Sequence, residues 1–125
     1  MSSRRVLLAL RPGSPLHRLL DVAATLCRRL DAELDVLADP ARGDIAKIQS
    51  RLADLGASGL PVTLSQVSPL TATEVIAHAQ RHESIVSVVV GRPAAWSAAG
   101  EDPWARLDCP LIAASDLPES SNNPA

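Results

Sequence analysis

The sequence predicts a doubly wound α/β domain: a five-stranded parallel sheet in the order 3-2-1-4-5 with helices on both faces. Short apolar runs alternate with amphipathic helical segments along the chain, which is typical of such a sheet. The runs at residues 5–10 and 85–90 are apolar apart from Arg5 and Ser87, as buried central strands are. The run at residues 62–67 alternates apolar and polar side chains, which favours an edge position. The flavodoxin order 2-1-3-4-5 would bury this alternating strand on both faces and is therefore disfavoured.

The first helix follows the first strand after a short turn. Leucine, alanine and cysteine side chains recur at helical spacing between Leu16 and Leu30. Ser14 and Pro15 precede this pattern, so we expect Ser14 as the N-cap and Pro15 as the first helical residue. A second apolar run, at residues 33–38, predicts the second strand.

The second and third helices carry similar start signals. Asp39 followed by Pro40 predicts the start of the second helix, and Gly56 predicts its end. Thr71 and Glu74 have the spacing of a capping box, which predicts the start of the third helix.

The last part of the chain is less regular. The fourth strand ends at Gly91, and an irregular loop is expected at 92–103 with a short helix at 103–107. Residues 110–114 predict the last strand. We place the domain at residues 1–115 and expect a disordered tail at 116–125.

Composition narrows the class of protein. With 125 residues, 46% of them hydrophobic, the chain suits one globular domain. The net charge of −2 argues against a nucleic-acid partner. No apolar run approaches the roughly 18 residues that span a bilayer, and no signal-peptide pattern is seen, so no membrane partner and a cytoplasmic location are expected. Cys27 and Cys109 are expected to be free thiols in that compartment.

The predicted strand order places a ligand crevice where the chain reverses direction, at the carboxyl ends of the first and fourth strands. The candidate crevice residues are Arg11, Gly13, Ser14, Gly91, Arg92 and Trp96. Arg11 could bind a phosphate or carboxylate, or it could be an ordinary surface residue. Gly13 and Ser14 could offer backbone N–H groups to an anion, although an ordinary tight turn is the favoured interpretation.

The remaining candidate residues have structural alternatives. Trp96 and Trp104 are the only aromatic residues of the Phe, Trp and Tyr group, and both fall in the irregular loop. They could stack on a flat ligand, but filling the crevice or packing at a subunit contact is favoured. His78 and His82 have the i, i+4 spacing of metal ligands on a helix, yet no further ligands are placed to complete a site, so no metal is predicted. No nucleophile motif or carboxylate pair supports catalysis.

Three segments resemble the universal stress protein family. They are RVLLALRPGSPLHRLLDVAATLCRRLDAELDVL, SIVSVVVG and LDCPLIAAS, which resemble the family's first strand to second strand, its fourth strand and its last strand. The resemblance extends over nearly the whole chain to Ser115 and implies the fold described above. It also implies a homodimer through the last strand, whose candidate interface residues are Leu111, Ile112 and Ala113, since a bare apolar edge needs a partner.

Members of that family that bind ATP carry an aspartate at the end of the first strand, where this chain has Arg11. They also carry a glycine-rich motif after the fourth strand. Counted from Gly91, its later positions fall on Ala94, Trp104 and Ala105, and counting back from the Cys-Pro pair does not recover it either. Because those glycines let backbone N–H groups approach phosphates, weak or absent ATP binding and no cofactor are expected.

Three functional hypotheses follow from these observations. The leading one is a non-catalytic regulatory or interaction protein of the universal stress class. The second is a nucleotide-binding stress protein with a diverged pocket, in which Arg11 contacts the ligand. The third is a small hydrolase or transferase.

Overall fold

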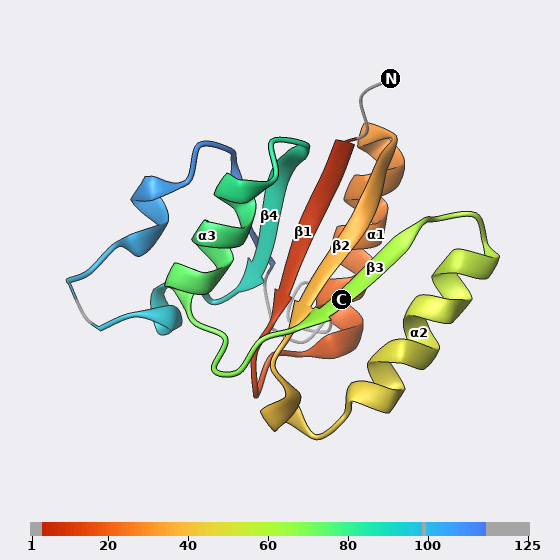
Figure 1. The fold of residues 1–125 in the computed structure, drawn as a ribbon, viewed down its shortest axis with the longest axis horizontal. Helices are drawn as coiled ribbons and strands as arrows, with labels where there is room; N and C mark the ends of the chain where they lie inside the picture. The colour runs from red at the N-terminus through yellow and green to blue at the C-terminus, as the bar shows by residue number, and fades with distance from the viewer. Residues whose placement is uncertain (1–3, 99, 115–125) are drawn as a thin grey trace, which may run out of the picture.

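The computed structural model describes residues 4–98 and 100–114, and it contains the predicted five-stranded sheet in the order β3-β2-β1-β4-β5. All four strand pairs are parallel, as expected (Figure 1). The strands are β1 (Arg4–Leu10), β2 (Ala32–Ala38), β3 (Val62–Gln66), β4 (Ile85–Gly91) and β5 (Leu111–Ala114). The two apolar strands, β1 and β4, lie inside the sheet, and the alternating strand β3 forms one edge.

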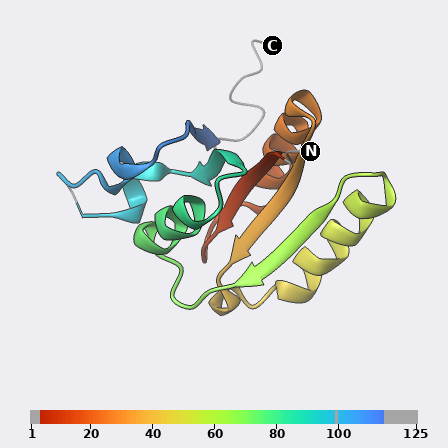
Figure 2. The ribbon, with the colours of Figure 1, turned by 45° about the horizontal axis from the view of Figure 1, so that its top comes forward.

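Three α-helices cover the two faces of the sheet within the described residues. They are α1 (Leu16–Leu30), α2 (Ile45–Ala57) and α3 (Ala72–Arg81). The crossovers through α1 and α2 step in one direction across the sheet, and the crossover through α3 steps back. Because such crossovers are right-handed, α1 and α2 lie on one face and α3 on the other (Figures 1 and 2).

Side chains from the two sheet faces form two separate hydrophobic cores. Val6, Leu8 and Leu10 of β1 pack towards α1 and α2. Leu7 and Ala9, which alternate with them, pack towards α3. Every one of these five side chains has 0% of its surface exposed, which explains why β1 is apolar at each position from Val6 to Leu10.

The start of α1 differs from the prediction. Pro15 is the N-cap residue, and α1 begins at Leu16. Ser14 belongs to the preceding turn, because its backbone N–H donates to the carbonyl oxygen of Arg11 at 3.1 Å. The prediction that Ser14 caps the helix is therefore wrong by one residue.

The start and end of α2 were also placed incorrectly. Asp39 and Pro40 begin a short 3-10 helix, η1 (Pro40–Arg42), and α2 begins only at Ile45. Gly43, with a φ of 79°, ends η1 in a left-handed conformation that favours glycine. Gly56 lies inside α2 rather than after it.

Other local predictions are confirmed. The Thr71 hydroxyl accepts a hydrogen bond from the Glu74 backbone N–H at 3.2 Å, as the capping pattern requires. Residues 103–106 form the 3-10 helix η3 (Pro103–Arg106), close to the expected short helix, and Cys27 and Cys109 are both free. The expected disordered tail, 116–125, lies outside the described residues.

Within residues 4–98 and 100–114, no helix has both the length and the apolar character that crossing a membrane requires.

Candidate functional site

The expected crevice forms where the loops after β1 and β4 meet. It is a small hollow of about 170 Å³ lined by Arg11, Pro12, Gly13, Ser14, Pro15, Gly91, Arg92 and Ala95. Five of the six predicted crevice residues therefore come together, and Trp96 is the one outside the lining. The sheet order accounts for this arrangement, because β1 and β4 are adjacent and both end at this edge.

Arg42 holds the loop after β1 in place. Its guanidinium donates to the carbonyl oxygens of Arg11 at 2.7 Å and of Ser14 at 3.0 Å. The same guanidinium donates two hydrogen bonds to the Asp44 carboxylate, at 2.8 and 3.0 Å. Only 6% of the Arg42 side chain is exposed. Arg42 thus links the β1–α1 loop to the segment before α2.

Sequence reasoning missed Arg42 because its partners lie 28 and 31 residues away and are backbone carbonyl groups, which every residue carries. A side chain can reach such groups in any sequence, so no residue pattern marks the contact. The local signal is Asp44 two residues later, and that pair does not point to carbonyl groups of another loop.

Trp96 points into the protein instead of lining the hollow. It ends the 3-10 helix η2 (Pro93–Trp96), and 9% of its surface is exposed. Its indole N–H donates to the carbonyl oxygen of Gly91 at 3.0 Å. Trp104 packs edge-on against it with ring centroids 5.5 Å apart and donates its own indole N–H to Pro93 at 2.9 Å. Both indoles are thus satisfied inside the domain, and neither lines the hollow that they were expected to fill.

Arg11 lines the hollow and contacts Trp96. The guanidinium carbon lies 4.7 Å from the centre of the Trp96 ring, which is the distance of a cation–π contact. Partial burial lowers the pKa of the Arg11 guanidinium from its usual value, although arginine remains charged at neutral pH. The carbonyl of Arg11 is held by Arg42, so both ends of this residue have partners within the protein.

The chemistry of the hollow is therefore limited. Its lining carries two arginines, Arg11 and Arg92, and one hydroxyl, Ser14, but no histidine or carboxylate that could act as a base towards that hydroxyl. Such a lining suits weak attraction of an anion rather than nucleophilic catalysis.

His78 and His82 do not belong to this site. They lie at the end of α3, with ring centroids 4.5 Å apart. The Nε2 atom of His78 is 2.9 Å from the Asp35 carboxylate, which is buried on β2, and Arg5 approaches the same carboxylate at 3.9 Å. Among the described residues no group of three histidine, cysteine or acidic side chains is arranged to hold a metal ion.

The candidate dimer residues lie on the second edge strand. Strand β5 pairs with β4 on one side, and its other side is the second edge of the sheet. Leu111 and Ile112 are half-buried there and Ala113 is exposed.

Comparison with known proteins gives matches by structure and none by sequence. No family model matches the chain, and no curated protein matches it significantly. The universal stress protein from Archaeoglobus fulgidus in complex with dAMP matches with a TM-score of 0.64 and 16% identity, over 91% of this chain and 99% of that one. The chain has the universal stress protein fold.

Two further solved structures agree with this result. A universal stress protein from Archaeoglobus fulgidus DSM 4304 matches with a TM-score of 0.68 and 19% identity, over 90% of this chain and 44% of that longer one. Universal stress protein UspA from Lactobacillus plantarum matches with a TM-score of 0.52 and 14% identity, over 91% and 99%. At such identities the likeness to universal stress proteins establishes the fold.

Proposed function

We propose that this chain is a non-catalytic regulatory or interaction protein of the universal stress class, and that it does not bind ATP tightly. The observation that carries the proposal is the contact of Arg11 with Trp96 at the crevice where the fold places a ligand. Arg11, which lines that crevice, is thus already in contact with a side chain of the protein itself.

The size of the hollow supports the same conclusion. Pockets that enclose small ligands have volumes of roughly 300–1,000 Å³, whereas this hollow measures about 170 Å³. A nucleoside triphosphate also needs several backbone N–H groups close to its phosphates. The loop after β4 offers Pro93, Ala94 and Ala95 near Gly91, and proline has no N–H to donate.

Binding of dAMP is a property of the Archaeoglobus protein named above. A diverged nucleotide pocket is the second candidate function for this chain, since Arg11 and Arg92 could attract a phosphate. An exposed charge contributes only about 1 kcal/mol, however, and micromolar affinity requires about 8 kcal/mol.

We further propose that the chain acts as a cytoplasmic homodimer that pairs through β5. An unpaired strand edge leaves backbone N–H and C=O groups free, and the half-buried Leu111 and Ile112 add apolar surface beside them. Pairing with a second copy about a two-fold axis would satisfy both.

Calorimetric titration of ATP with magnesium tests the main proposal, with tryptophan fluorescence as a second signal because Trp96 contacts Arg11. We expect no saturable heat and no change in fluorescence up to about 1 mM ligand. Saturation at tens of micromolar would instead favour the diverged nucleotide pocket. Turnover of ATP above a no-protein blank would favour the third hypothesis, a small hydrolase or transferase.

A further inference from the structure

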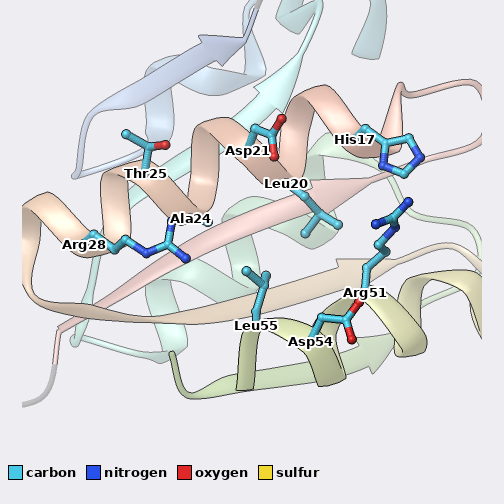
Figure 3. A pocket seen from close by; sticks show the side chains of 9 residues that line it. All are labelled: His17, Leu20, Asp21, Ala24, Thr25, Arg28, Arg51, Asp54 and Leu55. Atoms are coloured by element: carbon cyan, nitrogen blue, oxygen red, sulfur yellow. The ribbon is translucent and has the colours of Figure 1, made fainter. Parts of the chain in front are cut away.

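A second hollow lies away from the crevice, between α1 and α2 (Figure 3). Its volume is about 480 Å³, within the range of small-ligand pockets. Its apolar lining consists of Leu20 and Ala24, which are buried, and Leu55, which is half-buried. The rest of the lining is polar or charged: His17, Asp21, Thr25, Arg28, Arg51 and Asp54. We call this hollow the α1–α2 groove.

The positions of the apolar residues explain why a groove remains between the helices. Helix α2 packs on the sheet mainly through Ile48 and Leu52, its two buried residues. Towards α2, α1 offers Ala24, which is small, and Leu20, one turn earlier. Leu20 and Leu55 face each other across the groove and form its apolar floor (Figure 3).

The two arginines of the groove lean into it. In Figure 3 the Arg51 side chain extends from α2 towards His17 on α1, and the Arg28 side chain extends from α1 towards Leu55. Within residues 4–98 and 100–114, neither Arg28 nor Arg51 forms an ion pair with a carboxylate. Neither guanidinium donates a hydrogen bond to an acceptor among the described residues either, so both keep donors for a ligand.

The two acidic residues of the groove do not neutralise these arginines. Asp21 points away from α2 in Figure 3, and Asp54 stays beside its own helix. Neither carboxylate comes within 4.0 Å of Arg28 or Arg51 to form an ion pair, although Asp54 is only three residues from Arg51. Positive charge is thus presented over the apolar floor while the negative charge lies at its rim.

We propose that the α1–α2 groove binds a small organic anion with an apolar body, of the carboxylate or phosphate monoester class. The guanidinium of Arg51, beside His17, would bind the anionic head, because its planar donors match the oxygens of a carboxylate or phosphate. The apolar body would lie on Leu20 and Leu55. Arg28 marks the other end of the groove, roughly 16 Å from His17 along the axis of α1 at 1.5 Å per residue.

This site does not depend on the crevice beside Arg11 or on the edge of β5. It goes beyond the proposed function by giving the protein a place to receive a small-molecule signal. Failure of the test below would leave the ATP and dimer proposals unaffected, because those concern other residues.

The test is a titration of the full chain followed by amide chemical shifts in NMR, with sodium octanoate and monooctyl phosphate as probes. We expect the shifts of Leu20, Ala24 and Leu55 to move and to saturate near millimolar probe. Comparison of the two probes shows whether a carboxylate or a phosphate head binds better. Acetate, which lacks the apolar body, and octan-1-ol, which lacks the charge, should each bind at least about tenfold more weakly.

Two variants make the test specific. Arg51→Gln should weaken octanoate binding about fivefold, because it removes an exposed charged donor and keeps a polar side chain of similar length. Lys47→Gln removes a positive charge from an exposed position of the same helix outside the groove and should leave binding unchanged. Equal binding of octanoate by Arg51→Gln and the wild type, or equal shifts with octan-1-ol, would overturn the proposal.

Discussion

The buried carboxylate of Asp35 offers a sharp test of how the α3 face is held together. Asp35 lies on β2 with 3% of its surface exposed, directly opposite Leu7 of β1. Its close partner is His78 of α3, at 2.9 Å, and Arg5 approaches it at 3.9 Å. Replacing His78 with leucine removes the hydrogen bond and leaves the carboxylate among apolar side chains.

The expected cost can be worked out from these contacts. Breaking a fully buried pair typically costs about 3–5 kcal/mol. Here 13% of the His78 side chain is exposed and Arg5 still provides partial compensation, so we expect His78→Leu to lower the free energy of unfolding by about 2–3 kcal/mol. That loss corresponds to a fall in Tm of roughly 10 °C for a domain of this size.

Urea unfolding followed by tryptophan fluorescence measures this change. A second substitution separates the cost of leaving the Asp35 carboxylate unpaired from the cost of altered packing around position 78. Asp35→Leu combined with His78→Leu should recover at least half of the loss, because no polar group is then left buried without a partner. His17→Leu, at an exposed position of α1, is the control and should change stability by less than about 0.5 kcal/mol. If the double variant is no more stable than His78→Leu, the stability lost in His78→Leu does not come from an unpaired Asp35 carboxylate, and the reasoning is wrong.

Three further predictions concern other parts of the molecule. Ile112→Lys should convert dimers into monomers in sedimentation, whereas Thr63→Lys on the opposite edge strand should not; a monomeric wild type at micromolar concentration would refute pairing through β5. Burial raises the pKa of Cys27 to about 11, so native Cys27 should resist thiol reagents at pH 8 and react only after unfolding, and rapid native labelling would contradict this. The hydrogen bond from Arg42 lowers the pKa of Asp44 in the folded protein. The stability that the ionised Asp44 contributes should therefore be complete above the pKa that Asp44 has in the unfolded chain, and it should be lost as the pH falls through the lower pKa of the folded state. Urea titrations between about pH 6 and 2 should therefore show a smaller acid-induced loss for Arg42→Gln than for the wild type.

The strand pattern was sufficient to predict the sheet, because burial on both faces favours apolar residues at most positions. Strand β1, from Val6 to Leu10, shows this directly. An edge strand leaves one face partly in water, which is why the alternation at Val62–Gln66 identified β3. The helix starts were harder to predict. Asp39 followed by Pro40 is a valid start signal, but it begins η1, and α2 starts five residues after Pro40.

The candidate site was predicted only in part, for a different physical reason. Sheet order brought the loops after β1 and β4 together, so five of the six crevice residues were identified in advance. The orientation of Trp96 depends on its hydrogen bond to the backbone carbonyl of Gly91. The position of the β1–α1 loop depends on the hydrogen bonds from Arg42 to the carbonyls of Arg11 and Ser14. Sequence patterns do not mark such contacts, because every residue carries a backbone carbonyl. The α1–α2 groove was missed because a hollow between helices leaves no pattern within either helix.

Arg11, Trp96 and Trp104 pack in a row, and we expect that a single substitution at Arg11 does not create a nucleotide site in the crevice. Arg11→Asp would place an aspartate where the resemblance to ATP-binding universal stress proteins leads us to expect one. The Trp96 indole would still be held by Gly91 and packed on Trp104, so the loop after β4 would keep its fold and the hollow would stay small. We therefore expect no ATP binding in calorimetry below about 1 mM, together with a loss of about 0.5–2 kcal/mol of stability from the missing cation–π contact. Arg11→Lys keeps the charge beside the ring and should retain much of that stability. Micromolar ATP binding by Arg11→Asp would show that the charge of Arg11 alone, and not the packing of the loop after β4, excludes the nucleotide.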